Sequence, residues 1–462
     1  MYLNSLGYGV GKSALEIIKQ CDDWYSNRVI DDFHKRKNLN NVEYELSRMN
    51  FAKRCCADDA NLCEIISVAP EKESKAQDFI DKVLEKNRFN VRYREQLEKT
   101  SAVGTVGAYI YLKNAQYLEV NGNMQARGGE IRVNYVDADR IIPLTVDNGL
   151  VTECAFCATN MVKGKEKTTL VMFTSKEGKY KADTVVFDAE GQIISDETTS
   201  IQLGEVKPFS IMTNAEVNNL DEMKGTGYGL PKIYNAVPLF KALDLCYSVL
   251  FSDLSKADKI VLINEILCEI RDKNGKPTLT PQQKEIFVML GEKLPEDKSL
   301  IQEYNPEIRI EEITKAFELV LSLLSLLFGY GSKKYTFENG QIKTATEYIG
   351  SKQDAMQELN KQRKQAIDYV KDIIRAAMWF SNEFCGTKYN IEEELSIEFD
   401  DSVIVDRQTQ LEAMRADAVT FQEIPWLTFM YIKEKYNLSD EEAEKYINEG
   451  KMREEDVDDL TD

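Results

Sequence analysis

Residues 311–350 read EEITKAFELVLSLLSLLFGYGSKKYTFENGQIKTATEYIG. The first half repeats apolar residues at helical spacing and predicts a helix that stops at Gly329, because a glycine just past the last periodic residue is a frequent helix end. The glycines that follow, with the pair Asn339-Gly340, indicate a loop. A second helical pattern runs from about Ala345 to Phe384 and would reach roughly 60 Å at about 1.5 Å per residue. The stretch therefore predicts a helix, a glycine-bearing loop and a very long helix.

Similar patterns extend outward from this stretch. Another apolar helical pattern runs from Leu230 to about Lys259, and a compact mixed segment from Ile260 to Ile310 separates it from the helix that follows. From Ser101 to Pro208, short runs of alternating apolar and polar residues lie between Gly, Asn and Asp, which predicts five or more antiparallel strands. Helical patterns occupy Ser13 to about Leu97 and the part of the chain from Asp401 onward. The predicted fold class is α+β, with the β region between helical blocks.

Composition limits the kind of protein. Of 462 residues, 43% are hydrophobic and 29% charged, which is typical of a folded chain of several domains. The net charge of −20 at pH 7 argues against a protein that coats nucleic acid by neutralising phosphates. The longest apolar run, Leu319 to Gly329, has half the length that crosses a bilayer. Early polar residues also argue against a signal peptide, so we expect a reducing cytosol or a particle assembled there.

Metal-binding and catalytic patterns are weak. The nine cysteines are scattered, and the pair Cys154 and Cys157 lies in an alternating run that favours a strand with both thiols as small core residues. His34, the single histidine, lies in the charged segment DDFHKRKN and is expected to face solvent. Paired acids such as Asp58-Asp59 and Glu311-Glu312 are interpreted as charged helix faces. The sequence predicts no catalytic residue, no cofactor and no metal site.

One motif favours an alternative function. In GYGVGKSA, residues 7–14, Gly11, Lys12 and Ser13 match the second half of the phosphate-binding pattern G-x-x-x-x-G-K-[ST]. The first glycine of that pattern falls on Leu6, and starting from Gly7 shortens the spacer by one residue. Only MYLNSL lies upstream, which is too short for the buried strand that such a loop needs. A flexible segment before a helix is therefore favoured, and a P-loop nucleotide-binding enzyme stays as the alternative.

Four stretches, in this order of elements, carry a resemblance to a known family. They are RMNFAKRCCADDANLC (48–63), EKTSAVGTVGAYIYL (98–112), GTGYGLPKIYNAVPLFKALDLCYSVLFSDL (225–254) and YTFENGQIKTATEYIGSKQDAMQ (335–357). The chain resembles the portal proteins of tailed double-stranded DNA bacteriophages, particularly those that infect Gram-positive hosts. Lys343 to Glu347 are similar to the KTATE segment that recurs in this family before its long helix. The resemblance covers nearly the whole chain.

The resemblance implies a ring, usually of twelve copies, at one vertex of a capsid. It also implies a division of the chain into a wing (1–229), a first stem helix (230–259), a clip (260–310), a second stem helix (311–328), a tunnel loop (329–348), a long helix with the return strand of the wing (349–400), and a helical crown with an acidic tail (401–462). We expect Ser332, Lys333, Lys334, Thr336 and Lys343 of the tunnel loop to meet DNA, with Gly329, Gly331 and Gly340 as hinges. The same residue types are equally typical of an exposed loop that makes no DNA contact.

The function that the resemblance implies is passage of double-stranded DNA, which a terminase packages and which is later ejected. The implied partners are further copies of the chain, the terminase large subunit, head–tail connector proteins, and capsid and scaffolding proteins. The implied location is the virion, assembled in the host cytoplasm, without membrane contact and without enzymatic activity of the chain itself. Another minor structural protein of the virion is a further alternative, although such proteins are generally shorter and lack the two helices joined by a glycine loop.

Overall fold

The computed structural model describes most of the chain in two compact units. The described residues are 2–9, 11–38, 40–61, 63–72, 74–120, 123–162, 164–195, 198–255, 257, 260–264, 270–271, 276, 278–280, 287–290, 301–305, 307–331, 334–335, 345–400, 407–420, 425–436, 438, 442–445 and 447. The first unit comprises Met1–Asn61 and Pro70–Leu395, and the second comprises Leu62–Ala69 and Ser396–Asp462.

Two sheets form the β region of the first unit. The strands are β4 (Thr105–Lys113), β5 (Gln116–Val120), β6 (Asn123–Arg127), β7 (Glu130–Asp137), β8 (Ile141–Asp147), β9 (Leu150–Val162), β10 (Lys165–Lys176), β11 (Lys179–Phe187), β12 (Thr199–Gln202) and β13 (Phe209–Thr213). The larger sheet has the order β5-β6-β12-β11-β10-β9-β8 and the smaller has the order β13-β4-β7. Each pairing is antiparallel except β12 with β6, where Ile201 pairs with Met124. The predicted α+β fold class is confirmed.

Turn chemistry fixes the register of the long antiparallel strands. Asn148 and Gly149 alone separate β8 from β9, and both have positive φ, 48° and 81°. Two such residues form the type I′ turn that suits the right-handed twist of a hairpin. Glu177 and Gly178 join β10 to β11 in the same way, with φ of 55° and 78°. These turns therefore fix the register in which the apolar residues of each strand lie on the buried face of the sheet.

Aromatic side chains fill the space between the two sheets. The ring centroids of Tyr109 on β4 and Phe156 on β9 are 4.9 Å apart, and those of Phe173 on β10 and Phe209 on β13 are 5.7 Å apart. The long helix α9 (Ala345–Cys385) packs against β13 and β4. Its buried stripe includes Ala366, Tyr369, Val370, Ile373, Ile374, Ala377 and Met378. The helix therefore closes the core of this unit from one side.

Short helices near the N-terminus pack around α6 (Phe89–Val103), which contacts α2 (Lys12–Tyr25), α4 (Phe51–Asn61), α5 (Gln77–Lys86) and β4. The remaining elements of this region are α1 (Tyr2–Ser5), α3 (Asp31–His34), and a small hairpin of β1 (Lys35–Lys37) and β2 (Glu43–Glu45).

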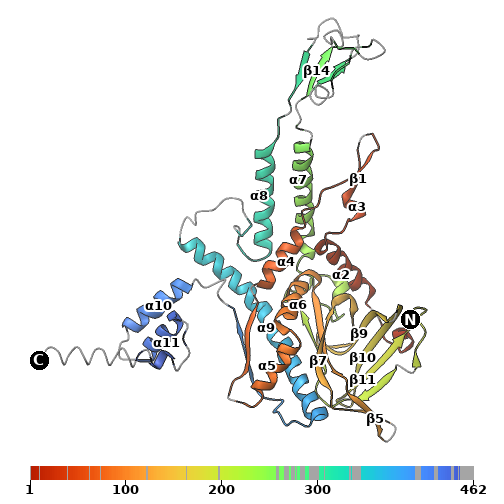
Figure 1. Cartoon of the computed structure of the whole chain (residues 1–462), viewed down its shortest axis with the longest axis vertical. Helices are drawn as coiled ribbons and strands as arrows, with labels where there is room; N and C mark the ends of the chain where they lie inside the picture. The colour runs from red at the N-terminus through yellow and green to blue at the C-terminus, as the bar shows by residue number, and fades with distance from the viewer. Residues whose placement is uncertain are drawn as a thin grey trace, which may run out of the picture. The chain divides into compact units, whose positions relative to one another are not determined.

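Helices α7 (Val237–Ser255) and α8 (Ile310–Leu327) lie side by side (Figure 1). At their shared end, the Arg309 guanidinium donates two hydrogen bonds of 2.9 Å to the Asp253 carboxylate. Helix α7 begins at Val237, later than the expected Leu230, and Pro238 lies in its first turn, where proline costs no helical hydrogen bond. Along the chain between the two helices, β14 (Ile260–Asn264), β15 (Phe287–Leu290) and β16 (Ile301–Tyr304) form a sheet of order β15-β14-β16.

The second unit combines a small sheet with two helices. Strand β3 (Ile65–Pro70) pairs with β17 (Leu395–Phe399). Beside this pairing, Ser67 Oγ donates to Glu398 Oε2 at 2.8 Å. Helices α10 (Arg407–Thr420) and α11 (Pro425–Tyr436) pack on each other. Among the helices described in either unit, none combines the length and the apolar character that a membrane span requires.

His34 is buried, contrary to the prediction that it faces solvent. Only 1% of the residue is exposed. Its Nδ1 accepts a hydrogen bond from the Ile30 N–H at 2.9 Å, so Nε2 carries the hydrogen and donates to Asp244 Oδ2 at 3.1 Å. The other oxygen of Asp244 accepts from the Met49 N–H at 2.8 Å. The hydrogen bond from the imidazole therefore offsets part of the free-energy cost of burying the Asp244 carboxylate, and it links α3 to α7.

Candidate functional site

The beginning of the predicted tunnel loop is a helix cap. Of its eight predicted functional residues, Gly329, Gly331 and Lys334 are described, and Ser332, Lys333, Thr336, Gly340 and Lys343 lie outside the described residues. The Tyr330 N–H donates to the Ser325 carbonyl at 2.9 Å, and the Gly329 N–H donates to the Leu326 carbonyl at 3.1 Å. With φ of 77° at Gly329, this is the Schellman motif that ends many helices. Gly329 thus has a defined structural role, and its role as a hinge stays a prediction.

The loop then folds back on the end of α8. The Tyr335 N–H donates to Ser325 Oγ at 3.0 Å, and the Tyr335 ring lies edge-on to Phe51 of α4 with centroids 5.1 Å apart. Lys334 is exposed, and its Nζ is 5.6 Å from the centroid of the Tyr330 ring. In the described part of the loop, the exposed ammonium group of Lys334 therefore lies above the buried aromatic ring of Tyr330.

A buried ionic cluster lies at the base of this loop, and we call it the Lys232 cluster. Lys232 Nζ is 2.9 Å from Asp59 Oδ1 and 3.5 Å from Glu358 Oε1, with only 7% of the lysine side chain exposed. The hydroxyls of Tyr330 and Ser101 both donate to the Asp59 carboxylate. Members of the cluster come from α4, α6, the segment before α7, the segment after α8, and α9. Five separate parts of the first unit therefore meet at one buried cation.

The ionisation of this cluster follows from its partners. Burial opposes the charge on Lys232, but the carboxylates of Asp59 and Glu358 outweigh it and raise the pKa of the ammonium group. Burial also acts to raise the pKa of Glu358, yet a hydrogen bond with Glu216 and the ammonium groups of Lys232 and Lys361 lower it to about 2. The pKa of Glu216 is raised by burial and by the neighbouring Glu358. The cluster is therefore one ammonium group, that of Lys232, between the carboxylates of Asp59 and Glu358. Glu358 is also in contact with Glu216, a carboxyl group that keeps its proton more readily.

The sequence did not reveal this cluster. We expected Asp58-Asp59 on a charged helix face, and that expectation is wrong. Asp58 is buried and pairs with Arg54 at 3.0 Å, while Asp59 is directed at Lys232. Its partners Lys232 and Tyr330 are 173 and 271 residues away along the chain. A local pattern of acids carries no signal of contacts this distant.

A second candidate surface is apolar and lies on the antiparallel helices α7 and α8. Ile313, Phe317, Leu321 and Leu324 of α8 are buried. Four other leucines of α8 form an exposed stripe, which we call the stem stripe: Leu319, Leu323, Leu326 and Leu327, between 43% and 63% exposed. On α7, Phe251 and Leu254 are exposed by 60% and 51%. A helix that is apolar on more than one face is normally covered on each of them, and the described residues of one chain leave this surface uncovered.

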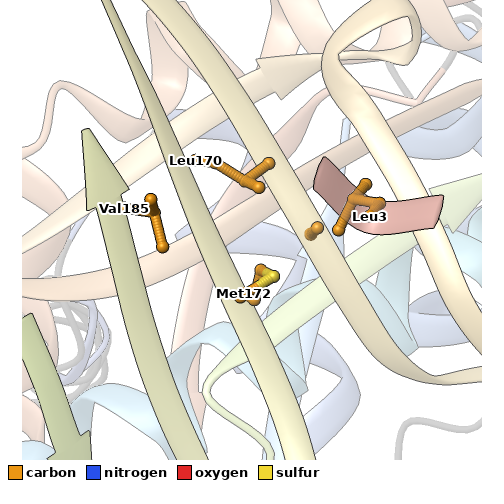
Figure 2. Close-up of a cluster of buried hydrophobic side chains, with 5 residues drawn as sticks. Leu3, Leu170, Met172 and Val185 are labelled. Carbon is orange, nitrogen blue, oxygen red and sulfur yellow. The ribbon is translucent and has the colours of Figure 1, made fainter. Parts of the chain in front are cut away.

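The motif GYGVGKSA lies in a setting unlike that of a phosphate loop. Residues upstream of it form the short helix α1 in place of a strand, and α2 begins at Lys12 with Gly11 as its N-cap. Leu3 of α1 packs on Leu170, Met172 and Val185 of the larger sheet (Figure 2). The segment therefore anchors the start of the chain on the outer surface of that sheet, and its geometry gives no support to the nucleotide-binding alternative.

The C-x-x-C pair also has a structural explanation. Cys154 and Cys157 lie three residues apart on β9, so their side chains point to opposite faces of the sheet. Cys154 is buried and Cys157 is half-buried, and burial raises the pKa of both thiols. Within the described ranges, no group of three or more His, Cys, Asp or Glu side chains is arranged to hold a metal ion.

Comparison with known proteins identifies the family. The family model described as phage portal protein, SPP1 Gp6-like, matches residues 12–455. A search of curated proteins gives no match. A solved structure entitled "Neck of native GTA particle computed with C12 symmetry" contains a similar chain, with 10% identity over 79% of this chain and 85% of that one and a TM-score of 0.38. Because the family model takes in both sheets, the helix pair α7–α8 and the long helix α9, the chain belongs to the SPP1 Gp6-like family of phage portal proteins.

Proposed function

We propose that identical copies of this portal protein close into a ring, of twelve copies as the resemblance implies, whose bore passes double-stranded DNA at one capsid vertex. In this proposal α7 and α8 form the stem, the sheet β15-β14-β16 belongs to the clip, residues 329–348 form the tunnel loop, and α10 and α11 belong to the crown. The β region and the N-terminal helices form the wing. A phage of a Gram-positive host is part of the proposal.

The observation that carries the ring is the apolar surface of α7 and α8 that the described part of the chain leaves exposed. The stem stripe lies on α8, and the exposed Phe251 and Leu254 lie on the other helix of the pair, α7. If the stripe of one copy covers α7 of the next, the contact is heterologous, and repeating it generates a ring when the rotation closes. Each of these leucines is about half exposed, so burying the remainder stabilises the contact by roughly 0.7–1.5 kcal/mol. Several such leucines in every interface are enough for stable self-association.

Charge explains how DNA passes without being held. The chain carries a net charge of −20 at pH 7, and each added copy increases the negative charge of the ring. A bore of this kind lacks the dense cations that bind phosphates by releasing counterions. We propose that Lys334, together with Ser332, Lys333, Thr336 and Lys343, touches the phosphates only briefly. The terminase large subunit hydrolyses ATP and drives the DNA, and the ring itself catalyses no reaction.

The remaining partners follow from the same proposal. Head–tail connector proteins dock on the clip after packaging, and capsid and scaffolding proteins surround the wing during assembly in the host cytoplasm.

The first prediction concerns assembly. The purified full-length protein is expected to form annular particles with a central hole in negative-stain images, with a mass by light scattering that is a multiple of 52.8 kDa. A protein that stays monomeric at micromolar concentration would contradict the ring and with it the proposed function.

A second prediction concerns the loop cations. Replacing Lys333 and Lys334 with glutamate is expected to leave the rings intact and to reduce the DNA packaged or retained in heads, because like charge then faces the phosphates. The matched control reverses Lys176 and Lys179, two exposed lysines beside the β10–β11 turn. Packaged DNA is measured by nuclease protection in both variants. Normal DNA-filled heads from the loop variant would refute the placement of these lysines at the bore.

A further inference from the structure

We infer that the Lys232 cluster positions the tunnel loop by clamping its first residues to α4 and α9. The inference deepens the proposed function, because it names the residues that set where the loop begins in the bore. It rests on the contacts that Lys232, Asp59 and Glu358 make with residues 328–330.

The last residue before the loop, Phe328, and the first two residues of the loop each lie beside a member of the cluster. The ammonium group of Lys232 lies 5.5 Å from the ring centroid of Phe328 and 5.8 Å from that of Tyr330, within the range of cation–π attraction. Gly329, between them, faces Glu358, because a Cβ on this glycine would lie 3.0 Å from Glu358 Cγ. The Tyr330 hydroxyl donates to Asp59. Three consecutive residues thus contact one lysine and its two carboxylates.

The clamp connects the loop to the rigid part of the molecule. Asp59 is on α4, which packs on α6, and it also accepts a hydrogen bond from Ser101 of α6. Glu358 is on α9, which packs across β13 and β4. The Lys232 N–H donates to the Ser101 carbonyl at 3.0 Å, so the backbone before α7 is fixed to the same helix. A displacement of Tyr330 therefore acts on α4, α6 and α9 together.

The cost of burying the cation keeps the clamp closed. A buried ammonium group is tolerated only where carboxylates and hydrogen bonds replace water. Lys232 has two carboxylates and two aromatic faces, and releasing Tyr330 removes one of those faces and one hydrogen bond to Asp59. Moving Tyr330 away therefore leaves the Lys232 ammonium group with fewer partners or exposes it to water. Both outcomes cost free energy, so the start of the loop rarely opens.

The test uses Tyr330→Phe, which keeps the ring and removes the hydroxyl that Asp59 accepts. In the full-length assembled protein, hydrogen–deuterium exchange of peptides covering Gly329 to Tyr335 is expected to become about tenfold faster, as is usual when a hydrogen bond to a charged group is lost. The melting temperature serves as the measure of overall stability.

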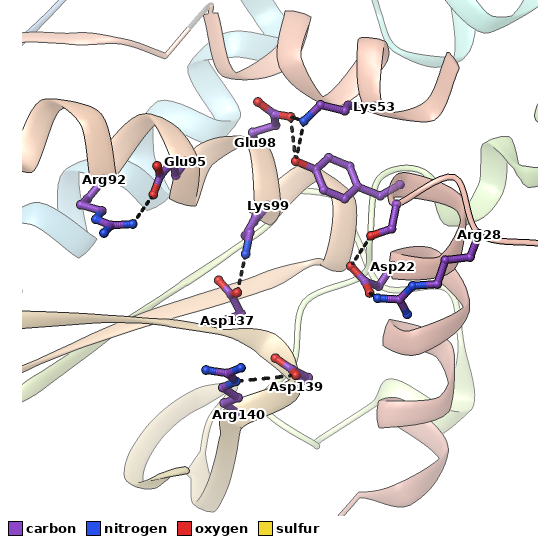
Figure 3. Close-up of polar contacts among 12 residues, drawn as sticks. Asp22, Arg28, Lys53, Arg92, Glu95, Glu98, Lys99, Asp137, Asp139 and Arg140 are labelled. Atoms are coloured by element: carbon purple, nitrogen blue, oxygen red, sulfur yellow. Dashed lines mark hydrogen bonds and ion pairs between the residues drawn. The ribbon is translucent and has the colours of Figure 1, made fainter. Parts of the chain in front are cut away.

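Tyr25→Phe is the matched control. Tyr25 donates to Glu98 at 2.8 Å, and Lys53 Nζ is 3.0 Å from the same carboxylate (Figure 3), so the control loses the same kind of contact away from the loop. Faster exchange of the loop peptides in Tyr330→Phe alone would support the inference. Unchanged loop exchange, or the same change in both variants, would overturn it.

A second variant covers the case in which Tyr330→Phe does not fold. Glu358→Gln keeps the shape and removes the charge that faces Lys232, and it is expected to accelerate exchange of the same peptides. Lys361→Met is its control, because Lys361 pairs with the other side of Glu358 at 2.8 Å but is exposed. Equal exchange in the two variants would overturn the inference. Ring formation by the unmodified protein is scored separately, so failure of the proposed ring and failure of the clamp remain distinguishable.

Discussion

Gly104→Ala is expected to lose most of its native fold, with a destabilisation of roughly 4 kcal/mol or more, which is exceptional for one residue. Gly104 has φ of 79°, and a Cβ there would strike the Gly229 carbonyl oxygen and lie 2.7 Å from Pro231 N and 2.8 Å from the Leu230 carbonyl carbon. All three atoms belong to backbone, which cannot rotate away as a side chain can. The left-handed conformation alone costs about 1–2 kcal/mol for alanine, and the displaced chain segment adds the rest.

Gly386→Ala is the matched control for this prediction. Gly386 has φ of 75° with no atom within 4 Å of an added Cβ, so its variant bears the conformational strain alone. Thermal unfolding followed by circular dichroism should show a modest shift for Gly386→Ala and a missing or greatly lowered transition for Gly104→Ala. Similar shifts in both would mean that the close approach of Gly104 to Gly229 is not required for folding.

The second large effect is expected at the stem stripe. The double change of Leu323 and Leu326 to glutamate should abolish ring assembly while leaving the fold of each copy intact. Both leucines are already exposed in a single chain, by 43% and 55%. Because about half of each side chain is already buried within one chain, losing the two leucines removes roughly 1.5–3 kcal/mol from every interface, which weakens each contact by a factor of roughly 10 to 100. Like charges on neighbouring copies weaken it further.

Sedimentation velocity of the purified protein measures this outcome directly. The matched control places glutamate at Leu150 and Met161, which are exposed by 71% and 70% on the larger sheet, and rings should persist there. If the variant at Leu323 and Leu326 still sediments as a ring at the same concentration, the subunits contact one another through other surfaces.

The parts of the fold that follow local rules were predictable. Alternating residues between Gly, Asn and Asp gave the strands β7 to β11, and the Asn148-Gly149 turn shows why the pattern holds its register. The helix α9 begins at Ala345, as the spacing predicted. Periodicity and turn chemistry act over a few residues, so both are visible in the sequence.

The contacts that build the candidate site were not predictable in this way. His34 has its partner Asp244 at a separation of 210 residues, and Tyr330 has its partner Asp59 at 271. His34 lies in the charged segment DDFHKRKN, and Asp59 follows another acid, so the local pattern indicated solvent exposure for both. Burial was decided instead by the packing of α3 against α7 and of α4 against the end of α8. The start of α7 was placed too early because Pro231 suits a first helical turn, whereas the proline that lies in the first turn is Pro238.

The contact between Gly104 and Gly229 has a genetic consequence. Both partners present only backbone, since a Cβ on Gly229 would lie 2.5 Å from the Gly104 carbonyl oxygen. No smaller amino acid exists, so a larger residue at one position has no compensating substitution at the other. A suppressor of a mutation at either codon therefore cannot arise at the partner codon and has to lie elsewhere in the chain or restore the glycine.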